Sequence, residues 1–141
     1  YRQTMFASFE REVHKRAAEG GDTTPDGLQA LWYELNRKYY GPDIVIDEPL
    51  KMEWARIPHF YNPFYVYQYA TGFSAATALA QLILKKGAPA RDRYLEFLSM
   101  GGSDYPIELL KNAGVDMSSP KPIKEVVRVF TKTLDEMEKL L

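Results

Sequence analysis

Apolar residues recur three and four positions apart along nearly the whole chain of 141 residues, and no run alternates long enough to predict a β-strand. The only strand-like triplet, residues 44–46, is too short to build a sheet by itself. Glycines stand where several helical patterns stop, at Gly20, Gly41 and Gly101. These features together predict an all-α fold.

The clearest helix start is at Thr24, which is an expected N-cap, with Pro25 at the first helical position. Asn62 and Pro63 repeat that pattern and predict a long helix that runs to about Lys86. Ser103 is the expected N-cap of a helix over 106–113. The remaining helices are expected from the first residues to Gly20, from Pro49 through Trp54, and over 91–100 and 123–141.

Length and composition predict one all-helical domain over residues 1–141. The net charge is −1, and acidic and basic residues are interspersed, so nothing favours nucleic acid or an anionic membrane as a partner. The chain has no cysteine, which excludes disulfides and thiolate metal sites. A reducing compartment, and hence a cytoplasmic location, is the natural expectation.

The run from Phe60 to Leu84 has no charged residue and is long enough to cross a bilayer, which takes about 20 apolar residues. It contains several polar side chains, among them Asn62, Gln68 and Gln81, and no basic cluster adjoins it. A buried helix is therefore favoured over a membrane span.

Four tyrosines crowd the same run directly after His59, one of two histidines in the chain. On the predicted helix, Tyr65 and Tyr69 share the face nearest His59, whereas Tyr67 points elsewhere. These rings could be core residues whose hydroxyls bind main-chain carbonyls. They could instead form a site, because a neutral phenol donates a hydrogen bond without acting as a base at neutral pH. The residues alone leave both alternatives open.

Metal and nucleotide motifs are missing from these residues. There is no HExxH motif, and His14 stands alone on an amphipathic helix, where a solvated position is expected. The turn "GGSDYP" lacks the preceding strand and the lysine of a phosphate-binding loop. No metal ligand is assigned within the chain.

Several segments do resemble one family: "YRQTMFASFE", "LNRKYYGPD", "EWARIPHFYNPFYVYQYATGFSAA" and "RYLEFLSMGGSDYPIELLKNAGVDMSSP". Together they are similar to the C-terminal part of oligoendopeptidase F, a bacterial zinc metallopeptidase of the thimet oligopeptidase-like group. The resemblance implies an all-α fold with a channel for short peptides. It also implies that the HExxH zinc motif lies upstream of these residues. The helical pattern that starts uncapped at the first residues independently suggests a piece of a longer chain.

The resemblance implies roles for particular residues. His59 lies in the family's "IPHF" segment and would hydrogen-bond the substrate backbone, with Tyr65 and Tyr69 as oxyanion or backbone donors. Tyr61 and Tyr67 would contact substrate, and the assignment among the tyrosines stays open.

The implied partners are an oligopeptide substrate and the upstream half of the catalytic domain. This portion alone is expected to be inactive, to bind no zinc, and to self-associate through apolar surface left uncovered. The alternative is a non-catalytic helical module whose aromatic face binds a peptide or a partner helix.

Overall fold

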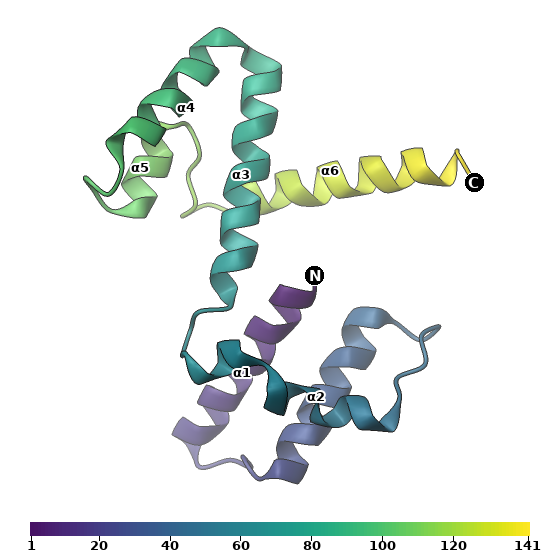
Figure 1. Cartoon of the computed structure of the whole chain (residues 1–141). Helices are drawn as coiled ribbons and strands as arrows, with labels where there is room; N and C mark the ends of the chain where they lie inside the picture. The colour runs from purple at the N-terminus through teal and green to yellow at the C-terminus, as the bar shows by residue number, and fades with distance from the viewer. The chain divides into compact units, whose positions relative to one another are not determined.

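The computed structural model describes all residues, 1–141, and contains helices and turns but no strand, so the all-α prediction is confirmed. The chain divides into two compact units, residues 1–70 and 71–141. The elements, in chain order, are α1 (Arg2–Glu19), α2 (Pro25–Tyr40), the 3-10 helices η1 (Glu48–Arg56) and η2 (Pro58–Tyr61), α3 (Tyr67–Lys86), α4 (Ala88–Met100), α5 (Pro106–Asn112) and α6 (Lys121–Glu138) (Figure 1).

The first unit is organised around α1 and α2, which pack against each other. Helix α1 ends at Gly20, whose φ of 72° is left-handed and whose N–H donates to the Arg16 carbonyl. Helix α2 starts as the sequence predicts: Thr24 is extended, its hydroxyl accepts from the Gly27 N–H, and Pro25 opens the helix. Local sequence signals therefore determine both ends of the turn that joins α1 to α2.

Replacing Thr24 with alanine should destabilise the first unit by about 1 kcal/mol, since the N-cap acceptor is lost. The effect includes the bond from the Thr24 hydroxyl to Asp22 Oδ1, which is 2.6 Å long. Urea denaturation followed by far-UV circular dichroism measures the difference. Thr23→Ala, at the exposed neighbouring position, is the control. Equal midpoints for the two variants would contradict the capping assignment.

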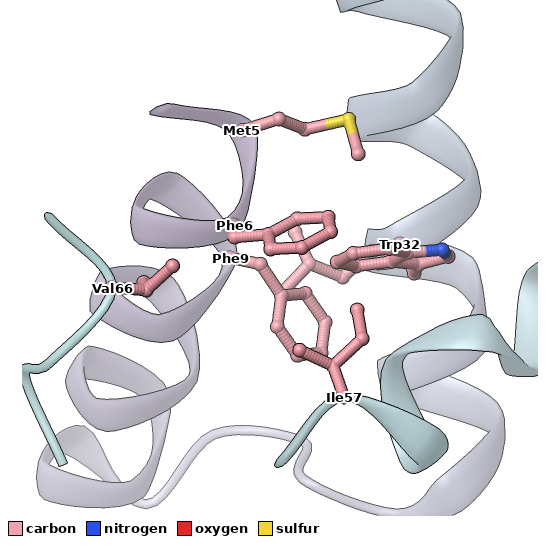
Figure 2. Packing of buried hydrophobic residues seen from close by; sticks show 7 residues of the cluster. Met5, Phe6, Phe9, Trp32, Ile57 and Val66 are labelled. Atoms are coloured by element: carbon pink, nitrogen blue, oxygen red, sulfur yellow. The ribbon is translucent and has the colours of Figure 1, made fainter. Parts of the chain in front are cut away.

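The core of the first unit is an aromatic cluster centred on Trp32, which is fully buried. Its ring centroid lies 5.3 Å from that of Phe6 and 5.0 Å from that of Phe9, both of which belong to α1. Ile57 and Val66 enter the same cluster from outside α1 and α2 (Figure 2). These two buried residues therefore anchor both ends of the segment 58–65, which contains His59.

That segment departs from the sequence prediction. The helix expected from Asn62 begins only at Tyr67, because Asn62 is extended and Phe64 has a left-handed φ of 58°. The short helix expected from Pro49 is a 3-10 helix, η1, and Ile57 leaves the helical region because Pro58 follows it. His59 then lies in the single 3-10 turn of η2.

The second unit contains most of α3 together with α4, α5 and α6. Leu79, Ala113 and Val115 form its buried cluster, and α4 packs against α5. Helix α4 starts at Ala88, earlier than the expected residue 91, because Gly87 turns the chain with a φ of 68°. Ser103 is not an N-cap: Tyr105 precedes α5, and no side chain caps it.

Helix α6 carries a stripe of apolar side chains on a largely exposed face. Ile123, Val127 and Met137 are each exposed by more than half, at 54%, 52% and 51%. On the opposite face, Arg128 donates to Gln81 of α3 over 3.2 Å. The stripe is therefore apolar surface that the rest of the second unit does not cover. No helix has both the length and the apolar character that crossing a membrane requires.

Candidate functional site

Three of the residues singled out by sequence converge in the first unit. The His59 Nε2 and Tyr69 Oη atoms are 3.3 Å apart, within hydrogen-bonding distance. The His59 and Tyr65 rings are stacked with centroids 5.8 Å apart, and Tyr69 meets both rings edge-on, at 5.4 Å and 5.7 Å. We call His59, Tyr65 and Tyr69 the aromatic triad. Its existence was expected, although Tyr65 lies before α3 and not on it.

The tyrosines of this segment are open to solvent. Tyr65 is 39% exposed and Tyr69 is 45% exposed. These values do not fit the alternative in which the rings are packed core residues, since the core rings of Phe6, Phe9 and Trp32 are at most 5% exposed. Side chains that already contact one another at an accessible surface can meet a ligand without large rearrangement.

The Tyr69 phenol has a pKa raised above its usual value of 10.0, chiefly because of a hydrogen bond with Tyr65. Partial desolvation and the charge on Tyr65 act in the same direction. Tyr69 therefore keeps its proton throughout the neutral range and remains a hydrogen-bond donor.

Tyr61 and Tyr67 stand apart from the aromatic triad. The Tyr61 hydroxyl donates to the Ala55 carbonyl oxygen at 2.8 Å, so this phenol already has an acceptor within the chain. Tyr67 is the first residue of α3 and is 49% exposed, but it makes none of the ring contacts that join the triad. Both side chains remain accessible from solvent.

Core packing positions His59. Its neighbour Phe60 contacts Phe6, Phe9 and Trp32, with ring centroids 5.8 Å, 5.2 Å and 6.1 Å apart. His59 Nδ1 is buried without a hydrogen-bond partner, so Nε2 is the ring nitrogen that faces Tyr69. The aromatic core therefore fixes which nitrogen of the imidazole is presented.

Glu10 also contributes to the site, and sequence reasoning missed it. Its carboxylate is buried, and Oε1 accepts the Phe64 N–H at 2.8 Å. The sequence did contain a signal for Glu10 in its helical spacing. Glu10 follows Phe6 by four residues and precedes Val13 by three, so an acidic side chain lies on the apolar face of α1. A charged residue there needs a partner, and the partner is more than 50 residues away in the chain.

Metal ligands are not gathered anywhere in the chain: no group of three or more histidine, cysteine, aspartate or glutamate side chains could hold an ion. His14 is exposed, as the sequence predicts, and its ring lies 4.5 Å from that of Phe64. The residues present therefore do not fit a zinc site.

The sequence matches the model of peptidase family M3 over residues 1–129. Because this match covers most of the chain, the protein belongs to that family. The relatives that match all 141 residues include oligopeptidase PepF of Bacillus subtilis at 57% identity and the chromosomal oligoendopeptidase F of Lactococcus lactis subsp. cremoris at 43%.

A crystal structure of oligoendopeptidase F from Enterococcus faecium has the same fold, with a TM-score of 0.94 and 47% identity over 99% of this chain. The chain spans only 21% and 23% of the length of the two sequence relatives and 27% of the crystallised chain. The comparisons thus establish the family and the fold of a segment about a quarter as long as these peptidases.

Proposed function

We propose that these residues form the substrate-binding, C-terminal portion of a zinc endopeptidase that hydrolyses internal bonds of short peptides in the cytoplasm. The observation that carries the proposal is the aromatic triad, an accessible set of donors held in mutual contact. Family membership supports peptide hydrolysis as the reaction, and the names of the relatives, oligopeptidase and oligoendopeptidase F, support oligopeptides as the substrates.

In this proposal, His59 and Tyr69 donate hydrogen bonds to carbonyl oxygens of the bound peptide. Such donors accelerate acyl transfer when they bind the oxygen more strongly as negative charge develops on it. Tyr65 orients Tyr69 through the edge-on contact of their rings and is itself a second candidate donor. Tyr61 and Tyr67 contribute contacts to the peptide further from the reacting bond.

The zinc ion belongs outside this chain in the proposed enzyme, since the residues described here offer no ligand set. When bound, it would supply Lewis-acid chemistry at the scissile carbonyl. The 141-residue chain by itself is accordingly expected to be inactive. The partner that completes it is the upstream half of the catalytic domain, which in relatives is part of a chain about four times as long.

The exposed stripe of α6 suits this partnership. A contiguous row of large apolar side chains on a helix usually marks a surface that another element covers. The length of the relatives outside the matched segment supplies such an element, so we assign the stripe to packing against the rest of the peptidase. In the isolated chain, the same surface should drive self-association.

Val127→Glu should therefore reduce self-association of the isolated chain, because it places a charge in the middle of the stripe. Sedimentation velocity at several concentrations measures the change. Lys132→Gln on the opposite face alters the net charge by the same amount and is the matched control. A monomeric parent chain, or equal association of both variants, would contradict this use of α6.

The function is tested with an internally quenched peptide of eight to ten residues and purified full-length protein. We expect hydrolysis by the full-length protein, loss of activity with a chelator, and none in the 141-residue chain. His59→Ala should reduce turnover on the order of 100-fold while the zinc content stays unchanged. A full-length protein with no peptidase activity, or with normal rates after His59→Ala, would favour a non-catalytic peptide-binding module.

A further inference from the structure

Phe64 adopts a backbone conformation that its side chain disfavours. Its φ of 58° is the only positive value at a residue other than glycine. Such a conformation at a bulky residue persists only where surrounding structure enforces it, and it often marks a functional segment. The residue lies between His59 and Tyr69 and directly before Tyr65.

Two successive turns of helix α1 hold Phe64 in this conformation. Glu10 Oε1 accepts the Phe64 N–H over 2.8 Å, and the Glu10 side chain is buried, with 5% of the residue exposed. One turn further on, the His14 ring lies against the Phe64 ring, with centroids 4.5 Å apart. Backbone and side chain of Phe64 are thus both held by the same helix.

The direction of the chain at Phe64 determines where Tyr65 lies. Val66 is fully buried in the aromatic core, so the chain on the far side of Tyr65 is fixed as well. Had residues 62–66 continued as the helix that Asn62 and Pro63 predict, Tyr65 would follow helical spacing along α3. The left-handed residue instead brings the Tyr65 ring onto His59 in a near-parallel stack, with 19° between the planes.

We propose that Glu10 is a positioning residue for the aromatic triad: its buried carboxylate holds the Phe64 peptide in the left-handed turn that sets Tyr65 and, through it, Tyr69. Glu10 needs no contact with substrate for this role. The effect on turnover rests on the peptidase function proposed above, whereas the effect on the geometry of the triad does not.

The test compares Glu10→Leu, Glu10→Gln and Glu10→Asp in the full-length protein. Leucine removes the acceptor, glutamine keeps an acceptor oxygen at the same reach, and aspartate keeps the charge but retracts it by one methylene. If leucine prevents folding, aspartate still tests the contact. Crystal structures give φ at residue 64 and the His59–Tyr65 ring separation, and steady-state kinetics on the quenched peptide give kcat and KM separately.

We expect Leu and Asp to lose the left-handed turn and the ring stack and to lower kcat on the order of 10- to 100-fold, as misplaced catalytic groups do. Gln should keep the geometry and remain within about threefold of the parent, since the hydrogen bond persists. Leu31→Ala, which lowers the stability of the same core away from the turn, is the control for a general loss of stability.

An unchanged turn and ring stack in both Glu10→Leu and Glu10→Asp would overturn the proposal. So would an equal loss of kcat in Leu31→Ala at matched stability. A lost ring stack with unchanged turnover would support the positioning role of Glu10 and overturn the catalytic role proposed for the triad. The two proposals therefore fail in distinguishable ways.

Discussion

Tyr69→Phe in the full-length peptidase should lower kcat by about 100-fold, the usual cost of losing one donor to a developing oxyanion. The substitution removes a single oxygen, which lies 3.3 Å from His59 Nε2. The ring itself, with its edge-on contacts to His59 and Tyr65, remains. Hydrolysis of an internally quenched peptide measures the change, with zinc content determined on the same samples.

Tyr105→Phe is the control for this substitution, because Tyr105 is 79% exposed at the start of α5 and has no part in the triad. Its kcat and KM should match those of the parent enzyme. A rise in KM alone in Tyr69→Phe would assign its hydroxyl to ground-state binding of the peptide. Unchanged kcat and KM would remove Tyr69 from the proposed machinery.

Trp32→Ala should destabilise the first unit by about 3–5 kcal/mol, as large-to-small substitutions of buried aromatics do. Trp32 is fully buried, and three phenylalanine rings contact it, including Phe60 beside His59. The indole N–H has no partner in the fold, so the loss comes from packing and not from a hydrogen bond. Urea denaturation monitored by circular dichroism gives the free energy of unfolding.

Tyr105→Ala, at an exposed aromatic position, sets the baseline for this measurement. A midpoint shift for Trp32→Ala no larger than that baseline would mean that the aromatic cluster is not the main source of stability in the first unit. A large shift would show that the aromatic cluster stabilises the first unit. Phe60 packs against this cluster and is the neighbour of His59 in η2, so the same core also supports the candidate site.

The parts of the fold that sequence predicted well depend on local chemistry. Thr24 and Pro25 mark the start of α2 because the cap acceptor and the fixed φ act within one turn. Gly20 marks the end of α1 because only glycine adopts a left-handed conformation at little cost. Such signals need no knowledge of distant residues.

The segment 62–66 shows where local signals fail. Asn62 and Pro63 have the composition of a helix start, yet Phe64 is held in a left-handed turn by Glu10, and Val66 is drawn into a core built from α1 and α2. These contacts join residues far apart in sequence, so spacing alone could not reveal them. The error placed Tyr65 on α3, four residues before Tyr69.

The proximity of three of the candidate residues was nevertheless predicted. His59, Tyr65 and Tyr69 do come together, although through a turn and a ring stack and not through a shared helical face. Helical spacing could not show that the Tyr61 hydroxyl binds the Ala55 carbonyl, because that contact depends on the relative placement of η1 and η2. The buried acid on α1 was visible in the sequence but was not recognised as a partner for the loop.

Inhibition of the full-length peptidase by a phosphinic peptide, which mimics the tetrahedral state of the scissile bond, tests the central claim most directly. If His59 and Tyr69 bind the developing oxyanion, the inhibition constant should rise in Tyr69→Phe by the same factor, about 100-fold, by which kcat/KM falls. An inhibition constant that stays at the parent value while kcat/KM falls would contradict the claim.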